Sequence, residues 1–188
     1  MNKKILYIIQ RTFNESFIGI YKLFDILIPD LTLFSPLRKV SLSILTFSRI
    51  WSSTRIKKNQ HLTHLRKLQI WNNCFINRNN IFDNNSMIDI WNNCSIWYNN
   101  TFITSSHYEK QNIKRGNLNF TTFSKDISIW NNVWITSNCT ILPWTVIEDN
   151  VIIAAGSVCK GKLNKNNIYW WTPAKILRET KGFISKIT

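Results

Sequence analysis

Three histidines are the side chains of this 188-residue chain that titrate closest to neutral pH. His107 stands in the segment TSSHYEK, while His61 and His64 form an HxxH pair. An imidazole can accept a proton from a hydroxyl group, and a neutral imidazole can also bind zinc. The HxxH pair is followed by the basic residues Arg66 and Lys67. We therefore interpret those two histidines as exposed side chains and expect no metal.

The four cysteines, at positions 74, 94, 139 and 159, contain no close CxxC pair. That spacing excludes a zinc ribbon and does not resemble a disulfide scaffold. Reduced thiols in a core fit the pattern better, so we expect an intracellular, cytoplasmic protein.

Charge narrows the choice of partner. Lysine and arginine number 24 against 10 acidic residues, a formal net charge of +14. Such a balance indicates an anionic partner, which is a phosphate-bearing cofactor, a nucleic acid or an acidic membrane. The aromatic residues do not interleave with the basic ones as stacking platforms would, so we expect no nucleic acid.

The N-terminal segment, residues 1–48, contains no predicted signal peptide or membrane span. The apolar run Ile5–Ile9 is too short for either. Apolar residues at helical spacing then predict a helix over Phe13–Leu27, and Pro29 and Pro36 are expected to break it. We expect this helix to pack on the main domain. The alternative is an interfacial helix at the inner face of an anionic membrane.

A period of six residues organises the rest of the chain. It is clearest from 129 onwards, where five isoleucines and then a cysteine recur every six residues and a small or β-branched residue follows each isoleucine by four positions; the repeating positions are Ile129, Ile135, Ile141, Ile147, Ile153 and Cys159. This period is typical of a parallel β-helix, in which each hexapeptide forms one short strand and a corner.

Earlier positions group into triplets with the same period. The five triangular coils are 50/56/62, 70/76/82, 90/96/102, 129/135/141 and 147/153/159. All three irregular steps then fall at one corner of the triangle, and the longest extrudes a loop over residues 103–128 that contains His107. We expect a β-helix over 49–163, a tail over 164–188, and a functional site at the long loop.

The C-terminal stretch NVIIAAGSVCKGKLNKNNIYWWTPAKILRE resembles the hexapeptide-repeat acyltransferases, in particular their sugar O-acetyltransferase branch. That family typically has Asn-Pro-Ala-Lys and a basic tail where this chain has Thr172–Lys175 and Arg178. The resemblance covers about residues 40–180. It implies an all-β, left-handed parallel β-helix, a homotrimer and an acetyl-CoA-dependent O-acetyltransferase acting on a sugar or glycan precursor, as in polysaccharide biosynthesis.

The resemblance places the catalytic residue at His107, as the general base for the acceptor hydroxyl. The activated oxygen would attack the acyl-CoA thioester, with main-chain N–H groups holding the oxyanion. The family often has Asp after this His, where this chain has Tyr108, and Glu109 is the candidate for orienting the ring.

Further residues take roles from the same resemblance. Asn77 and Asp83 are expected to bind the acceptor, although Asn77 is equally well an ordinary corner residue. Trp134 is expected to line the acyl-donor or acceptor cleft, the alternative being that it simply covers its coil. Small residues are expected to let the pantetheine arm approach the backbone and basic residues to meet the phosphates; the expected CoA-binding residues are Thr136, Ser137, Ala154, Ala155, Lys160, Lys175 and Arg178.

Tryptophan is unusually frequent, with nine residues against five glycines. Eight of them stand where the family has glycine or another small residue; they are Trp51, Trp71, Trp91, Trp97, Trp130, Trp144, Trp170 and Trp171. We hypothesise that these eight represent UGA codons that the organism reads as glycine. The alternative is a genuine ladder of tryptophans stacked along the corners.

Two other functions remain open at this point. A serine O-acetyltransferase would share the fold, but the long helical N-terminal region of that family is missing. A non-catalytic β-helix scaffold, in which His107 is incidental, belongs to a different class.

Overall fold

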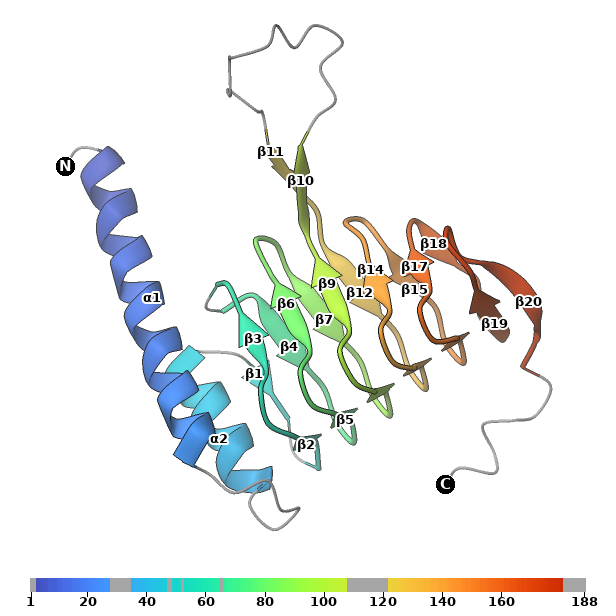
Figure 1. Ribbon diagram of the computed structural model, residues 1–188, viewed down its shortest axis with the longest axis horizontal. Coiled ribbons are helices and arrows are strands. Elements are labelled where there is room, and N and C mark those ends of the chain that lie inside the picture. The colour runs from blue at the N-terminus through green and yellow to red at the C-terminus, as the bar shows by residue number, and fades with distance from the viewer. Residues whose placement is uncertain are drawn as a thin grey trace, which may run out of the picture.

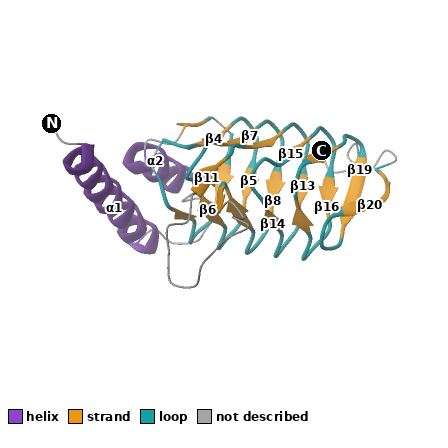
Figure 2. Ribbon diagram, turned by 90° about the horizontal axis from the view of Figure 1, so that it is seen from above, coloured by secondary structure: helices purple, strands orange, loops and turns teal. Residues whose placement is uncertain are grey.

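The computed structural model describes residues 3–27, 35–46, 49–51, 53–64, 66–107 and 122–180. Figure 1 shows a three-sided solenoid with two helices at its N-terminal end and a hairpin that projects from one side. Seen from above in Figure 2, successive coils are stacked along the long axis of the molecule.

Three sheets form the sides of the solenoid and are named faces A, B and C. Face A contains β1 (Arg49–Ile50), β4 (Leu68–Ile70), β7 (Ile88–Ile90), β12 (Ile127–Ile129), β15 (Val146–Ile147) and β18 (Lys162–Leu163). Face B contains β2 (Arg55–Ile56), β5 (Phe75–Ile76), β8 (Ser95–Ile96), β13 (Trp134–Ile135), β16 (Ile152–Ile153), β19 (Asn167–Trp170) and β20 (Lys175–Glu179). Face C contains β3 (His61–Leu62), β6 (Ile81–Asp83), β9 (Thr101–Ile103), β14 (Thr140–Ile141) and β17 (Val158–Cys159).

The residues predicted to recur every six positions are the ones that point inward and form the core. Ile76, Ile96, Ile135 and Ile153 are paired in succession along face B, and all four are fully buried. Because each inward aliphatic stacks on its counterpart one coil away, the interior is a continuous apolar column. The predicted fold class is confirmed: the chain is a left-handed parallel β-helix of about five coils.

Asparagines form the corners between the faces. Nine of them have φ between 55° and 62°, the left-handed conformation that Asn tolerates better than most residues; they are Asn59, Asn73, Asn79, Asn93, Asn99, Asn132, Asn138, Asn150 and Asn166. Several also donate a side-chain hydrogen bond to the Asn of the next coil, as Asn73 Nδ2 does to Asn93 Oδ1 at 2.9 Å. The repeated turn therefore explains much of the high asparagine content.

The tryptophans of the A–B corner form a ladder of two stacked pairs, between which the rings of Trp71 and Trp91 are tilted by 43° with centroids 6.4 Å apart. The rings of Trp51 and Trp71 are parallel, with centroids 4.5 Å apart, and Trp71 Nε1 donates to Asp89 Oδ1 at 2.8 Å. The rings of Trp91 and Trp130 stack at 6.0 Å. Among the described tryptophans, only Trp144 and Trp171 have positive φ, 68° and 83°. A preference for glycine based on backbone conformation therefore applies at those two positions.

Two helices cover the N-terminal end of the solenoid, α1 (Lys3–Leu27) and α2 (Ser35–Thr46). The prediction that Pro36 breaks the helical segment was wrong, because Pro36 occupies the first turn of α2, where no amide hydrogen is needed. The prediction of a helix beginning at Phe13 was also too short, since α1 begins at Lys3.

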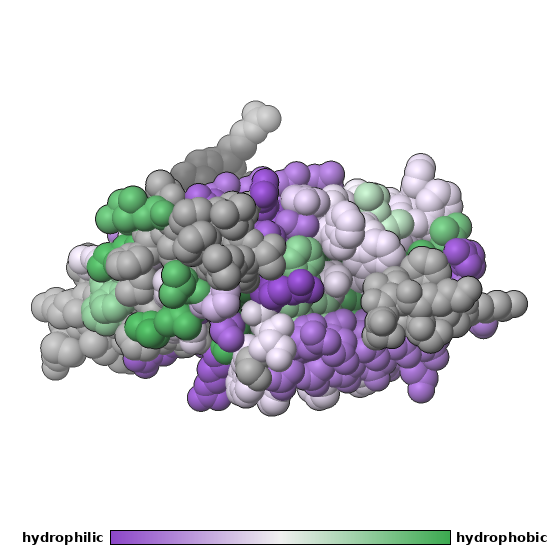
Figure 3. Space-filling model, turned by 90° about the horizontal axis from the view of Figure 1, so that it is seen from below, coloured by the Kyte–Doolittle hydropathy of each residue, from purple (hydrophilic) through white to green (hydrophobic). Residues whose placement is uncertain are grey.

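The helices are attached to the first coil by both apolar and polar contacts. Tyr21 and Leu42 belong to the same buried cluster as the solenoid core. Asp25 is also buried, and its Oδ2 accepts a hydrogen bond from the backbone N–H of Asn59 at 2.6 Å. The outer sides remain apolar, as Figure 3 shows at the helical end, with exposed residues Phe13, Ile20, Leu23, Leu27, Leu37, Val40 and Ile44. In the described ranges, no helix is long and apolar enough to cross a membrane.

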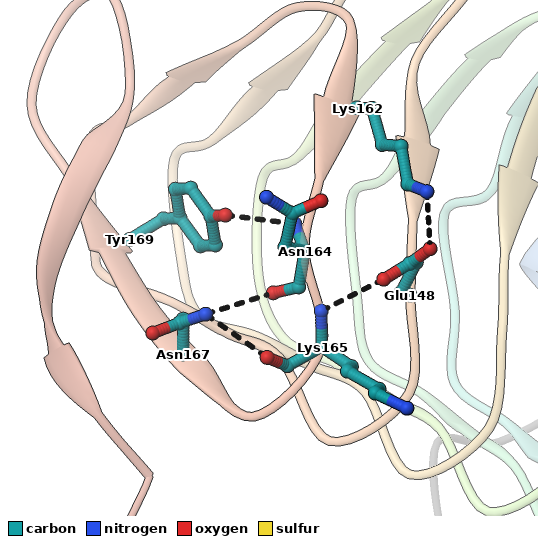
Figure 4. A network of polar contacts seen from close by, with 6 residues as sticks. All are labelled: Glu148, Lys162, Asn164, Lys165, Asn167 and Tyr169. Atoms are coloured by element: carbon teal, nitrogen blue, oxygen red, sulfur yellow. Dashed lines mark hydrogen bonds and ion pairs between the residues drawn. The ribbon is translucent and has the colours of Figure 1, made fainter.

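At the opposite end, β20 runs antiparallel to β19. A polar network fixes the corner before β19 (Figure 4). Glu148 accepts from Lys162 Nζ at 2.7 Å and from the backbone N–H of Lys165 at 3.0 Å, and these contacts hold the pKa of its carboxyl below the ordinary value. The hydroxyl of Tyr169 accepts from the backbone N–H of Asn164 at 2.7 Å.

Candidate active site

A pocket of about 430 Å³ lies at the C–A corner, where the chain passes from face C to face A. The long insertion leaves the solenoid here through an antiparallel hairpin, β10 (Ser105–His107) paired with β11 (Thr122–Ser124). His107 faces Thr122 across this hairpin and is exposed. The pocket is lined by Asp83, Ile103, Ser105, Ser106, His107, Thr122, Leu142 and Pro143.

Asp83, at the end of β6, is held in a network of neutral hydrogen-bond donors. Its Oδ1 accepts from Thr63 Oγ1 at 3.1 Å and from Asn85 Nδ2 at 3.0 Å. Its Oδ2 accepts from Ser105 Oγ at 3.4 Å, and Asn85 Nδ2 also donates to Ser105 Oγ at 2.9 Å. Three successive coils thus fix one carboxylate beside His107.

His64 extends the polar corner by one coil. Its Nδ1 lies 3.2 Å from Thr63 Oγ1, and its backbone N–H donates to Asn84 Oδ1 at 2.9 Å. Burial and the charge of Lys67 lower the pKa of the imidazole, against a smaller opposite effect of Asp83. The prediction that His61 and His64 are both exposed was therefore wrong for His64, which is half-buried. The Asn84 side chain bonds both the backbone N–H and the carbonyl of His64 and so holds this turn against the corner. Within the described ranges, no three His, Cys, Asp or Glu residues are placed to hold a metal ion.

A second pocket of about 500 Å³ lies at the B–C corner near the C-terminal end and is lined by Ala154, Ala155, Gly156, Trp170, Trp171 and Thr172. Thr136 and Ser137 occupy the same corner one coil below. Thr136 Oγ1 donates to the carbonyl of Ile153 at 2.7 Å, and the backbone N–H of Gly156 donates to the carbonyl of Ser137 at 3.0 Å. Ala154, Ala155 and Gly156 contribute only small side chains to this pocket, and the rest of its lining comes from Trp170, Trp171 and Thr172.

The three basic residues predicted for CoA phosphates lie at two places. Lys175 and Arg178 are exposed on β20, where Lys175 pairs with Trp170 beside the corner that holds Ala154 and Arg178 pairs with Ile168 further along face B. Lys160 is exposed at the C–A corner after β17, on the other side of face C.

Two predicted acceptor residues lie away from the His107 pocket. Asn77 is a buried B–C corner residue whose Oδ1 accepts from the backbone N–H of Arg78 at 3.0 Å. Trp134 lies on face B and lines a groove of about 640 Å³ there. Neither lines the pocket of the same chain's His107, and Tyr108 and Glu109 lie outside the described residues.

The sequence-based residues therefore form two groups on one chain. His107 and Asp83 meet at the C–A corner, whereas Ala154 and Ala155 meet at the B–C corner, with face C between them. Sequence reasoning missed Ser105 and Thr63, although aligning the coils at the C–A corner would have placed both beside Asp83.

Comparison with known proteins agrees with this architecture. Residues 126–161 match the family model described as bacterial transferase hexapeptide (six repeats). A segment of 59 residues is 36% identical to a putative lipopolysaccharide biosynthesis O-acetyl transferase, WbbJ, of Escherichia coli K12, covering 31% of this chain and 30% of that protein. A segment of 57 residues is 39% identical to the galactoside O-acetyltransferase of the same strain, covering 30% and 28%. The matched segments thus span less than a third of these relatives' own lengths.

Among solved structures, a hexapeptide-repeat-containing acetyltransferase from Vibrio cholerae O1 biovar eltor, complexed with acetyl coenzyme A, has the same fold. The TM-score is 0.76 at 25% identity, over 88% of this chain and 86% of that one. These findings confirm the predicted resemblance: the chain carries the hexapeptide repeat and has the β-helix of the hexapeptide-repeat acetyltransferases.

Proposed function

We propose that this protein is an acetyl-CoA-dependent O-acetyltransferase that acts on a hydroxyl group of a sugar or glycan precursor. One observation carries the proposal: His107 and the carboxylate of Asp83 line the same pocket on a fold shared with an acetyltransferase solved with acetyl-CoA. The named relatives, which act in lipopolysaccharide biosynthesis or on galactosides, support a sugar as the acceptor.

In this proposal His107 is the general base. Its imidazole takes the proton of the acceptor hydroxyl while the hydroxyl oxygen attacks the thioester carbonyl. The C–S bond then breaks, and the imidazolium returns the proton to the departing thiolate, which gives the acetyl ester and free CoA. Asp83 accepts a hydrogen bond from a second hydroxyl of the acceptor and so aligns the attacking one.

The donor would occupy the B–C corner. Ala154 and Ala155 let the pantetheine arm approach the backbone, with Thr136 and Ser137 below, and Lys175 and Arg178 meet the phosphates. Because face C separates this groove from the same chain's His107, the complete site requires the His107 corner of a neighbouring subunit. The proposed assembly is therefore a homotrimer with three shared sites.

Acetyl transfer from radiolabelled acetyl-CoA to a panel of sugars tests the proposal. Wild-type protein should label at least one sugar, and His107→Ala should abolish labelling while CoA binding and the circular dichroism spectrum are retained. His61→Ala is the matched control, since His61 is an exposed histidine outside the pocket. Wild-type activity in His107→Ala would refute the assignment.

Peripheral membrane contact is a second proposal for the N-terminal helices. It is supported by their outer apolar stripes, Phe13, Ile20, Leu23 and Leu27 on α1 and Leu37, Val40 and Ile44 on α2. Co-sedimentation with phosphatidylglycerol vesicles should be lost when Leu23 and Ile44 are changed to Ser. Sedimentation equal to the wild type would exclude this contact.

A further inference from the structure

His64 lies one coil before Asp83, and the proposed mechanism gives it no role. Its Nδ1 is 3.2 Å from Thr63 Oγ1, and Thr63 Oγ1 in turn donates to Asp83 Oδ1 at 3.1 Å. Asp83 lines the pocket that contains His107. A chain of two hydrogen bonds therefore links a second imidazole to the carboxylate that is proposed to bind the acceptor.

The turn that carries this chain is anchored by its backbone. Asn84 Oδ1 accepts from the backbone N–H of His64 at 2.9 Å, and Asn84 Nδ2 donates to the carbonyl of His64 at 2.8 Å. The backbone N–H of Thr63 donates to the carbonyl of Phe82 at 3.2 Å. A change of either side chain thus leaves these bonds in place, so the role of the side chains can be tested separately.

The direction of the two bonds depends on which ring nitrogen of His64 holds the proton. The Thr63 hydroxyl has one proton to donate, and Asp83 Oδ1 at 3.1 Å and Asn84 Oδ1 at 3.3 Å can both accept it. An unprotonated Nδ1 would be a further acceptor and would draw that proton away from Asp83. A protonated Nδ1 instead donates to the Thr63 oxygen and leaves the hydroxyl proton to Asp83.

The surroundings of His64 favour a neutral ring with its proton on Nδ1. Burial and the positive charge of Lys67 lower the pKa of the imidazole, against a smaller opposite effect of Asp83, so the ring carries one proton at neutral pH. With that proton on Nδ1, each bond of the chain has one donor and one acceptor. The chain then ends on a charged oxygen, and hydrogen bonds to ionised acceptors are the stronger ones.

We propose that His64 is a positioning residue for the acceptor, because its Nδ1–H directs the Thr63 hydroxyl onto Asp83 Oδ1. With Thr63 and Asn85 both donating to Oδ1, the carboxylate is kept from rotating, and Oδ2 stays on the side of Ser105. This inference rests on the proposed function, in which Asp83 aligns a hydroxyl of the acceptor. It adds a residue that acts on the acceptor only through Asp83.

The tautomer of His64 can be read without any substrate, by two-bond 1H–15N correlation NMR of labelled wild-type protein at neutral pH. The His64 signals are assigned by their loss in His64→Leu. We expect a protonated Nδ1 and an unprotonated Nε2. The opposite tautomer, with the proton on Nε2, would overturn the proposal whatever the activity of the protein.

Steady-state kinetics tests the effect on the acceptor, with whichever of galactose, maltose and N-acetylglucosamine the wild type acetylates. His64→Leu removes the donor and should raise the acceptor KM about threefold, a modest effect because Thr63 is exposed to water. His64→Asn places an amide N–H where Nδ1 was and should keep KM near the wild-type value. We expect unchanged kcat and unchanged Kd for CoA in both variants. His61→Leu is the matched control, at an exposed histidine of the same coil.

Two kinetic results would overturn the proposal. One is a wild-type KM in His64→Leu; the other is an equal increase in His64→Leu and His64→Asn, which would make the role of His64 purely structural. If His64→Leu does not fold, Thr63→Val should raise KM and Thr63→Ser, which keeps the hydroxyl, should not; equal values in these two variants would also overturn it. Wild-type protein that acetylates none of the sugars would refute the proposed function and the acceptor role of His64 with it, whereas an Nδ1–H signal would still establish the hydrogen-bond chain.

Discussion

The carboxylate of Asp83 reaches one coil along the solenoid to Ser105, whose hydroxyl oxygen lies 3.4 Å from Asp83 Oδ2 and only two residues before His107. Thr63 and Asn85 bind the other carboxylate oxygen at 3.1 Å and 3.0 Å. The contact between Ser105 and Asp83 thereby joins the insertion that carries His107 to the coils of the solenoid, at a carboxylate whose position is fixed by its other hydrogen bonds. In the proposed reaction this contact fixes the position of the acceptor, which Asp83 binds, relative to the general base His107.

Replacing Asp83 by Asn should raise the KM for the sugar acceptor about tenfold or more, because a hydrogen bond to a charged group contributes about 1.5–3 kcal/mol. The Kd for CoA should stay unchanged, since the donor groove lies at another corner. Steady-state kinetics and calorimetry measure the two quantities. Asp89→Asn is the control, because Asp89 lies on face A of the next coil and accepts a hydrogen bond from Trp71 Nε1. Equal effects of the two variants would exclude a specific role for Asp83.

Stability should depend on pH through His64. Its folded-state pKa is lowered, so below the ordinary value of about 6.5 the unfolded chain binds the proton more readily than the folded one. The free energy of unfolding should therefore fall as pH decreases from 6.5 through the lower, folded-state pKa, and the loss should then level off. Denaturant titrations of wild type and His64→Gln across that range measure this. A decline of equal size in His64→Gln would contradict it, and His61→Gln, at an exposed position, is the control.

Two tryptophans should respond oppositely to replacement by glycine. Trp144 has a φ of 68° and is 70% exposed, so Trp144→Gly should stabilise the fold by about 0.5–1 kcal/mol by relieving left-handed strain. Trp71 stacks on Trp51 and donates to Asp89, so Trp71→Gly should cost about 2 kcal/mol. Thermal unfolding compares them, and a gain in Trp71→Gly would show that the ladder is not stabilising.

The codons for these positions test the recoding hypothesis independently. UGA at Trp71, Trp91 and Trp130 would support glycine in the natural protein. UGG at those positions would instead make the stacked ladder genuine.

Much of the solenoid could be predicted because the position of each inward residue follows from a short repeat in the sequence. Ile96 and Ile135 share a face because each coil repeats the same inward position, and a period of six is visible in the letters alone. The position of Pro36 was misjudged because a proline that breaks a helix interior is equally suited to a first helical turn.

The candidate site was only partly predictable. Asp83 and His107 could be named, but the contact through Ser105 depends on how a hairpin leaves the corner. Trp134 was predicted to line the cleft, whereas its placement on face B, away from His107, depends on which side of the triangle its strand forms. His64 became half-buried through Asn84, a residue of the next coil.

Mixing two inactive variants tests most directly whether the His107 corner of one subunit and the Ala154 groove of another form one active site. His107→Ala would lack the base, and Ala154→Trp would block the groove, so each alone should show no acetyl transfer. After joint denaturation and refolding, the mixture should recover a substantial fraction of wild-type activity, because some sites combine an intact corner with an intact groove. A mixture that refolds into mixed oligomers but stays inactive would contradict the shared site.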